Sequence, residues 1–285
     1  MKRKGVAKSR YIASLLRLTR AGNLFIIALA QYFTAGFLLD KSTLDDFRLL
    51  IMSVSTVMIA AAGYIINDYY DVKIDYINKP HRVVIGKTIT RRYAILFHVL
   101  LSLMGISLGV LLHWKIGMVN ALSVFLLWFY SNYLKRLPFV GNFTVAALTG
   151  LSILVIDLLY RADNPLIYIY SSFAFFMTLI REIVKDAEDL KGDNSFGCKT
   201  LPIVIGVRKT KMVIYLILAL FIVMVIVLNY FYKALPFSYY MLFLFGPLVF
   251  LLYRLVRADT KKEYTFLSSF CKVIMLLGII SMAFV

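Results

Sequence analysis

Residues 49–75 read LLIMSVSTVMIAAAGYIINDYYDVKID, and this stretch decides the fold. Its first part, Leu49 to Ile66, contains no Asp, Glu, Lys or Arg. A helix needs about 20 apolar residues to cross a hydrocarbon core of about 30 Å. The segment is therefore expected to cross a membrane as a helix, and a group of aspartates follows directly at its end.

Eight other segments share this apolar character, so the sequence predicts nine membrane-spanning helices. Of the 285 residues 61% are hydrophobic and 16% are charged, which is typical of an integral membrane protein. The expected fold is an all-α, polytopic bundle of nine transmembrane helices, with a basic segment at residues 1–20 and one membrane domain at residues 21–285. The other eight segments are roughly 21–39, 93–112, 116–134, 141–156, 164–180, 212–232, 234–253 and 264–285.

The basic residues predict the orientation of these helices. Of the 32 Lys and Arg residues, 26 lie in the N-terminal segment and in the connections after the second, fourth, sixth and eighth spans. Cytoplasmic loops are enriched in Lys and Arg, so the N-terminus and these connections are expected on the cytoplasmic side of a cell membrane. The same distribution explains the net charge of +17 without nucleic acid as a partner.

Eight of the fifteen acidic residues lie in two stretches on this predicted cytoplasmic side. The first follows the second span and contains Asp68, Asp71 and Asp75. The second follows the sixth span and contains Glu182, Asp186, Glu188, Asp189 and Asp193. Both have the spacing D-x-x-D-x-x-x-D, which places three carboxylates on one face of a helix. A solvated loop explains one such stretch, but the recurrence after four further spans favours two acidic stripes that face each other in one site.

Clustered carboxylates repel one another unless a cation neutralises them. Mg²⁺ prefers carboxylate and phosphate oxygens, so the two stripes predict a Mg²⁺-bridged diphosphate. Basic side chains near the motifs are candidates to bind its oxygens, namely Lys73, Lys79, Arg82, Lys135, Arg136, Lys185, Lys191 and Lys199. Since the site lies in a bilayer and no Gly-rich phosphate loop is present, the expected substrate is a diphosphate with a lipid-soluble prenyl tail.

The two motifs resemble those of the UbiA superfamily of intramembrane prenyltransferases, a family of nine transmembrane helices. The resemblance rests on N-D-x-x-D-x-x-x-D at 67–75, the following residues Ile77 to Arg82, and D-x-E-D-x-x-G-D at 186–193. It implies that Asp68, Asp71, Asp75, Asp186, Asp189 and Asp193 bind Mg²⁺, with Asp71, Asp75, Asp189, Asp193 and Lys135 catalytic. It also implies that Asn67 contacts the substrate. Of the basic residues beside the motifs, Arg82, Lys185 and Lys199 are predicted to contact the substrate as well.

Members of this superfamily often carry Tyr-x-x-x-Lys at the end of the fourth helix. Counting back four residues from Lys135 gives Ser131, so the chain departs from that pattern. The nearest tyrosines are Tyr130 and Tyr133, which leaves open which of them takes the tyrosine role; Tyr130 is counted among the predicted substrate contacts. Arg20 to Asn23 and Leu134 to Asn142 are most similar to the branch that adds geranylgeranyl to geranylgeranylglyceryl phosphate. Arg20 and Asn23 are therefore predicted to bind substrate, although a positive-inside role also explains Arg20.

Three other functions would make different demands on the sequence or on its acceptor. Prenylation of an aromatic acceptor in quinone biosynthesis would use the same Mg²⁺-bound diphosphate, so it is the alternative that the motifs leave open. A cation transporter would need acids near the middle of several spans, and the spans are nearly free of them. A CDP-alcohol phosphotransferase would need an Asp-Gly dipeptide, which the chain lacks.

One acid, Asp157, lies near the end of the predicted fifth span. It is predicted to form an ion pair with Arg161, one helical turn later.

Overall fold

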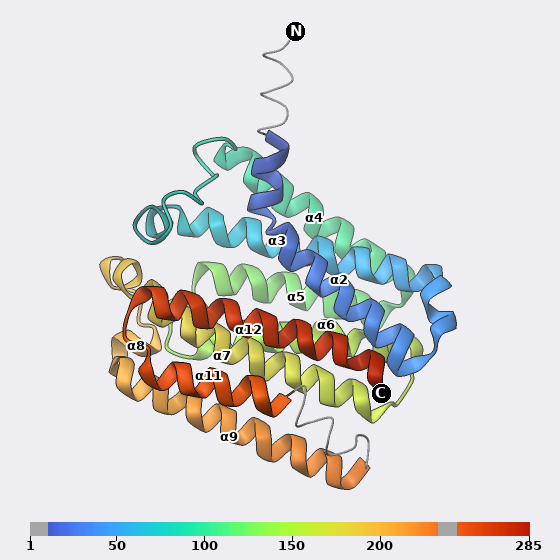
Figure 1. Cartoon of the computed structure of the whole chain (residues 1–285). Helices are drawn as coiled ribbons and strands as arrows, with labels where there is room; N and C mark the ends of the chain where they lie inside the picture. Colours follow the sequence, from blue (N-terminus) through green and yellow to red (C-terminus); the bar gives the residue numbers. More distant parts are fainter. Residues whose placement is uncertain (1–10, 233–243) are drawn as a thin grey trace. The chain divides into compact units, whose positions relative to one another are not determined.

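The computed structural model describes residues 11–232 and 244–285, and within these ranges the regular secondary structure is helical (Figure 1). The prediction of an all-α fold is confirmed. A single isolated β-bridge, between Ile85 and Ile89, occurs in the described residues. The chain forms two compact units, with residues 1–28 and 47–134 in unit 1 and residues 29–46 and 135–285 in unit 2.

Unit 1 contains three long helices that pack against one another, namely α3 (Phe47–Asn78), α4 (Arg91–Leu112) and α5 (Trp114–Asn132). Residues 11–18 and the first part of α2 (Ala21–Phe33) complete the described part of the unit. A buried polar contact joins the three helices. The Asn120 side chain donates to Ser55 Oγ at 2.8 Å and to the Gly105 carbonyl at 3.1 Å.

Unit 2 is built around α7 (Pro165–Ser195), which packs against α6 (Val140–Tyr160), α9 (Gly206–Tyr232) and α12 (Lys261–Ser281). Its buried core includes Ile180, Ile183, Phe221 and Ile274. The remaining elements are the end of α2, η1 (Thr34–Leu39), η2 (Lys41–Asp45), η3 (Leu134–Arg136), α8 (Leu201–Val204), α11 (Gly246–Arg257) and η5 (Met282–Phe284).

The two longest of the described helices extend well beyond the length that a membrane crossing requires. Helix α3 has 32 residues and α7 has 31. At 1.5 Å per residue each is roughly 45–50 Å long, against about 30 Å of hydrocarbon. The extra length carries both acidic motifs as continuous helix, as the sequence predicted.

Seven of the described helices are long and apolar enough to cross a membrane. Two of the nine predicted spans are not among them. The predicted span at 116–134 forms α5. The first half of the predicted span at 234–253 lies outside the described residues, and its second half overlaps α11. The number nine therefore stays a prediction.

The predicted pair between Asp157 and Arg161 is wrong. Helix α6 ends at Tyr160. The Arg161 amide still donates to the Asp157 carbonyl at 2.6 Å, but Arg161 adopts a left-handed conformation with φ of 50°, so its side chain does not continue the helical path toward the Asp157 carboxylate. The Asp157 carboxylate instead accepts hydrogen bonds from the Asp163 amide at 2.9 Å and the Tyr168 hydroxyl at 3.1 Å. It therefore stabilises the connection between α6 and α7.

Candidate functional site

The first acidic motif occupies the last part of α3, where the helix runs without interruption to Asn78. Asp68, Asp71 and Asp75 therefore lie along one helical face. Asp68 forms an ion pair with Arg20, whose Nη2 lies 2.9 Å from Oδ1. The side chains are 35% exposed for Arg20 and 18% exposed for Asp68, so the pair is partly shielded from water.

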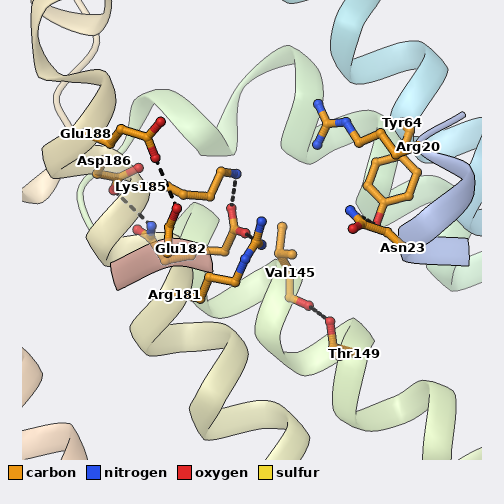
Figure 2. Close-up of polar contacts among 12 residues, drawn as sticks. Arg20, Asn23, Tyr64, Val145, Thr149, Arg181, Glu182, Lys185, Asp186 and Glu188 are labelled. Carbon is orange, nitrogen blue, oxygen red and sulfur yellow. Dashed lines mark hydrogen bonds and ion pairs between the residues drawn. The ribbon is translucent and has the colours of Figure 1, made fainter. Parts of the chain in front are cut away.

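Arg20 lies at the break between the helix at residues 11–18 and α2, with a φ of 53°. Its guanidinium also lies over the Tyr64 ring, 4.8 Å from the centroid, and Asn23 donates to the Tyr64 hydroxyl at 3.3 Å. These contacts bring two predicted substrate-binding residues to α3 one turn before Asp68 (Figure 2). Tyr64 was not predicted from the sequence, although a residue four positions before Asp68 is its neighbour on the surface of a helix.

The connection after α3 folds back on the end of that helix. Lys87 donates to the Pro80 carbonyl at 3.0 Å, and its ammonium lies 5.0 Å from the centre of the Tyr76 ring. Arg17 donates to the His81 carbonyl at 3.4 Å. Arg82, a predicted substrate-binding residue, lies on this connection and is exposed.

The second acidic motif occupies the last part of α7. Asp186 accepts a hydrogen bond from the buried Asn142 of α6, with Nδ2 and Oδ2 2.9 Å apart. Glu188 is directed elsewhere, because Ser268 of α12 donates to its carboxylate at 3.2 Å. The acidic stretch is thus divided between two faces of α7. Asn142 is a site residue that sequence reasoning missed, since nothing local links it to a residue 44 positions away.

Three charged residues precede this motif on α7. Glu182 is buried, and its two carboxylate oxygens contact Arg181 at 2.6 Å and Lys185 at 2.9 Å (Figure 2). Lys185 was predicted to bind substrate. Arg181 was not, because a basic residue next to a span end resembles an ordinary positive-inside charge. Glu182 was not, because it lies outside the repeated D-x-x-D-x-x-x-D spacing.

The segment that carries Lys135 lies beside the segment that carries Lys199. The Lys199 amide donates to the Arg136 carbonyl at 2.8 Å, so the loop after α7 is fixed against η3. Ser131, at the position of the expected tyrosine, donates its hydroxyl to the Leu127 carbonyl of its own helix at 2.8 Å. Tyr133 stacks on Phe129 and is exposed, whereas Tyr130 is half-buried. Tyr130 therefore stays a predicted substrate contact, and the tyrosine role stays open.

The donor chemistry of both motifs fits Mg²⁺ when it is shared with substrate phosphate. Within the described ranges, no group of three or more His, Cys, Asp or Glu side chains is arranged to hold a metal ion by itself. Mg²⁺ does not require such a cage, since one or two carboxylates together with phosphate oxygens and water usually hold it. The aspartates of each motif supply ligands of that kind.

Comparisons with known proteins identify the family of this chain. The family model described as "UbiA prenyltransferase family" matches residues 28–275. A digeranylgeranylglyceryl phosphate synthase of Methanosphaera stadtmanae is 33% identical over 240 residues, which are 84% of this chain and 88% of that protein. The identity and coverage of this relative are independent support for membership of the same family.

Two solved structures share the fold. One, from work on the biosynthesis of digeranylgeranylglyceryl phosphate synthase in membranes, has a TM-score of 0.73 at 23% identity and covers 96% of this chain and 98% of its own. The other is a UbiA homolog of Archaeoglobus fulgidus bound to GPP and Mg²⁺, with a TM-score of 0.61 at 15% identity and coverage of 95% and 100%. The predicted family is confirmed: this multi-pass membrane protein belongs to the UbiA prenyltransferase family.

Proposed function

We propose that this enzyme transfers a geranylgeranyl group from geranylgeranyl diphosphate to geranylgeranylglyceryl phosphate, a step of ether-lipid synthesis. The observation that carries the proposal is that each acidic motif lies at the end of a long apolar helix together with its own cations. Arg20 contacts Asp68 in unit 1, and Lys185 lies one residue before Asp186 in unit 2. This combination suits a headgroup that is both anionic and metal-bound.

The acceptor is supported by the relative of Methanosphaera stadtmanae, which is named digeranylgeranylglyceryl phosphate synthase. The prenyl diphosphate and the metal are supported by the Archaeoglobus fulgidus homolog, which binds GPP and Mg²⁺. Prenylation of an aromatic acceptor is the alternative that the same site chemistry allows.

In the proposed reaction the bond between C1 of the prenyl chain and the diphosphate oxygen breaks, and its electron pair leaves with the diphosphate. The acceptor hydroxyl then forms a new C–O bond with the allylic carbon and releases its proton. Bound Mg²⁺ would neutralise the charge that develops on the diphosphate. Asp71, Asp75, Asp189 and Asp193 would hold the metal-bound headgroup with Asp68 and Asp186, and Lys135 would donate to its oxygens.

Asn67, Asn23, Tyr130, Arg82 and Lys199 complete the proposed set of substrate contacts. The Lys and Arg residues of the even-numbered connections support a location of this site on the cytoplasmic side of the cell membrane. In that orientation the diphosphate stays in the headgroup region, and the prenyl chain lies among apolar helices.

The test supplies purified protein in detergent with Mg²⁺ and labelled geranylgeranyl diphosphate. Geranylgeranylglyceryl phosphate and a panel of aromatic acids are added in separate reactions. We expect a labelled lipid with the glyceryl phosphate and none when EDTA replaces Mg²⁺. Transfer to an aromatic acid alone would retain the chemistry and refute the acceptor, whereas no release of diphosphate with any acceptor would refute prenyl transfer.

A further inference from the structure

Arg181, Glu182 and Lys185 form a charged cluster on α7 just before the second acidic motif. Glu182 accepts from Arg181 with one carboxylate oxygen and from Lys185 with the other, at 2.6 and 2.9 Å. The three side chains are 16%, 10% and 23% exposed in chain order. This cluster therefore lies largely within the protein and not on a solvated surface.

The two cations are an unfavourable pair by themselves. Arg181 and Lys185 are four residues apart on one helix, where like charges repel. Left alone, their long side chains would extend toward water or lipid headgroups. Glu182 prevents this by contacting both, and so it fixes a guanidinium and an ammonium at one place.

Taken without its neighbours, the cluster of Arg181, Glu182 and Lys185 carries one net positive charge, which Asp186 offsets in part beside Lys185. Charge in a poorly hydrated place is costly unless it has a partner. In addition, the Arg181 Nε is buried and has no hydrogen-bond partner among the described residues. The cluster thus has donor capacity for an anion.

The position of the cluster indicates which anion this is. At 100° per residue, Glu182 and Lys185 share the face of α7 that carries Asp186, Asp189 and Asp193. Glu182 and Lys185 also interact electrostatically with Asp186. Lys185 therefore lies on the face of the aspartates, within about one turn of Asp186. Arg181 lies about 100° from Glu182 around the helix, and its guanidinium joins the cluster through its contact with Glu182.

We propose that Arg181 and Lys185 bind a phosphoryl group of a substrate and that Glu182 is the positioning residue that preforms this receptor. The proposal rests on the proposed function for its ligand, which is either the diphosphate of the prenyl donor or the phosphate of the glyceryl acceptor. Guanidinium and ammonium donors both form strong, charge-assisted hydrogen bonds to phosphate oxygens.

The experiment measures equilibrium binding without turnover, because only one substrate is present at a time. Labelled geranylgeranyl diphosphate or labelled geranylgeranylglyceryl phosphate is titrated with purified protein in detergent and Mg²⁺. The variants are Arg181→Gln, Lys185→Gln and Glu182→Gln. Lys211→Gln is the matched control, since Lys211 forms its ion pair with Asp259, outside this cluster.

Each of the three variants is expected to weaken binding of one of the two ligands roughly tenfold or more, as loss of a charge-assisted contact does. The ligand that is affected identifies the source of the phosphoryl group. Glu182→Gln is expected to add no further loss to the Arg181→Gln/Lys185→Gln double variant, because a positioning residue acts only through the groups that it holds.

Unchanged binding of both ligands in Arg181→Gln and Lys185→Gln would overturn the proposal, as would Glu182→Gln binding as tightly as the wild type. If Glu182→Gln does not fold, the two cation variants still decide the matter. Failure of the wild type to bind either ligand would instead refute the proposed function.

Discussion

Arg20 Nη2 lies 2.9 Å from Asp68 Oδ1, which joins the first motif to a residue 48 positions earlier. The same guanidinium lies over the Tyr64 ring at 4.8 Å. A predicted metal ligand therefore has a cation beside it before any substrate is bound. This arrangement holds Asp68 in place. The role of Arg20 in catalysis and its contribution to stability can be measured separately on an Arg20 variant.

Arg20→Gln is expected to lower the rate of prenyl transfer at least tenfold while changing the free energy of unfolding by less than about 1 kcal/mol. The stability effect is small because the pair is partly exposed, at 35% for Arg20 and 18% for Asp68. The rate and the thermal unfolding midpoint are measured on the same preparation. Arg17→Gln, on the preceding turn, is the control, and an equal loss in both variants would contradict a specific role for Arg20.

Asn142 tests the support of the second motif, because it donates to Asp186 at 2.9 Å. Asn142→Ala removes the donor, and we expect roughly a tenfold lower rate. Asn142→Asp puts a second carboxylate at the same place, so the loss should be larger and the Mg²⁺ concentration for half-maximal rate should change. A rate profile for Asn142→Asp identical to that of the wild type would show that Asp186 needs no such support.

Glu188 is expected to act in folding and not in the reaction, although it lies between two predicted metal ligands. Its carboxylate accepts from Ser268 of α12 and is buried. Ser268→Ala and Glu188→Gln should each destabilise the protein by about 1 kcal/mol and leave the rate within about threefold of the wild type. Loss of transfer in Glu188→Gln with the fold intact would assign Glu188 to the metal-binding set.

Gly109→Ala is expected to destabilise unit 1 by about 1–3 kcal/mol, as overpacking does. A Cβ at this position would overlap the Asn120 amide. That amide cannot move freely, since it is bonded to Ser55 and to the Gly105 carbonyl. Gly22→Ala is the control because its Cβ would meet nothing within 4 Å. Equal thermal midpoints for the two variants would contradict the close packing of α4 and α5.

Helical periodicity predicted the features that depend on residues near one another in the chain. The spans, the continuation of α3 and α7 past them, and the common face of each aspartate triplet follow from apolar length and a 100° turn per residue. The same rotation per residue puts Glu188 on a different face of α7 from Asp186, which was not predicted from the sequence.

The remaining contacts depend on how helices pack, which one sequence does not determine. Asn142 and Asp186 are 44 residues apart, and Glu188 and Ser268 are 80 residues apart. The Asp157 prediction failed because the end of α6 depends on a left-handed residue at Arg161 that helical spacing did not reveal. The contacts of Glu182 were local, but a carboxylate beside basic residues at a span end is also typical of an ordinary cytoplasmic boundary.

The central claim is that carboxylates from both motifs hold the metal-bound diphosphate. The most direct measurement compares Mg²⁺-dependent transfer from labelled geranylgeranyl diphosphate by the wild type, Asp71→Asn, Asp189→Asn and the control Asp163→Asn. Asp163 is exposed and has a φ of 46°, a conformation that asparagine tolerates. The account predicts that transfer is abolished in Asp71→Asn and Asp189→Asn, retained in Asp163→Asn, and that all three proteins fold. Full activity in both motif variants would contradict it.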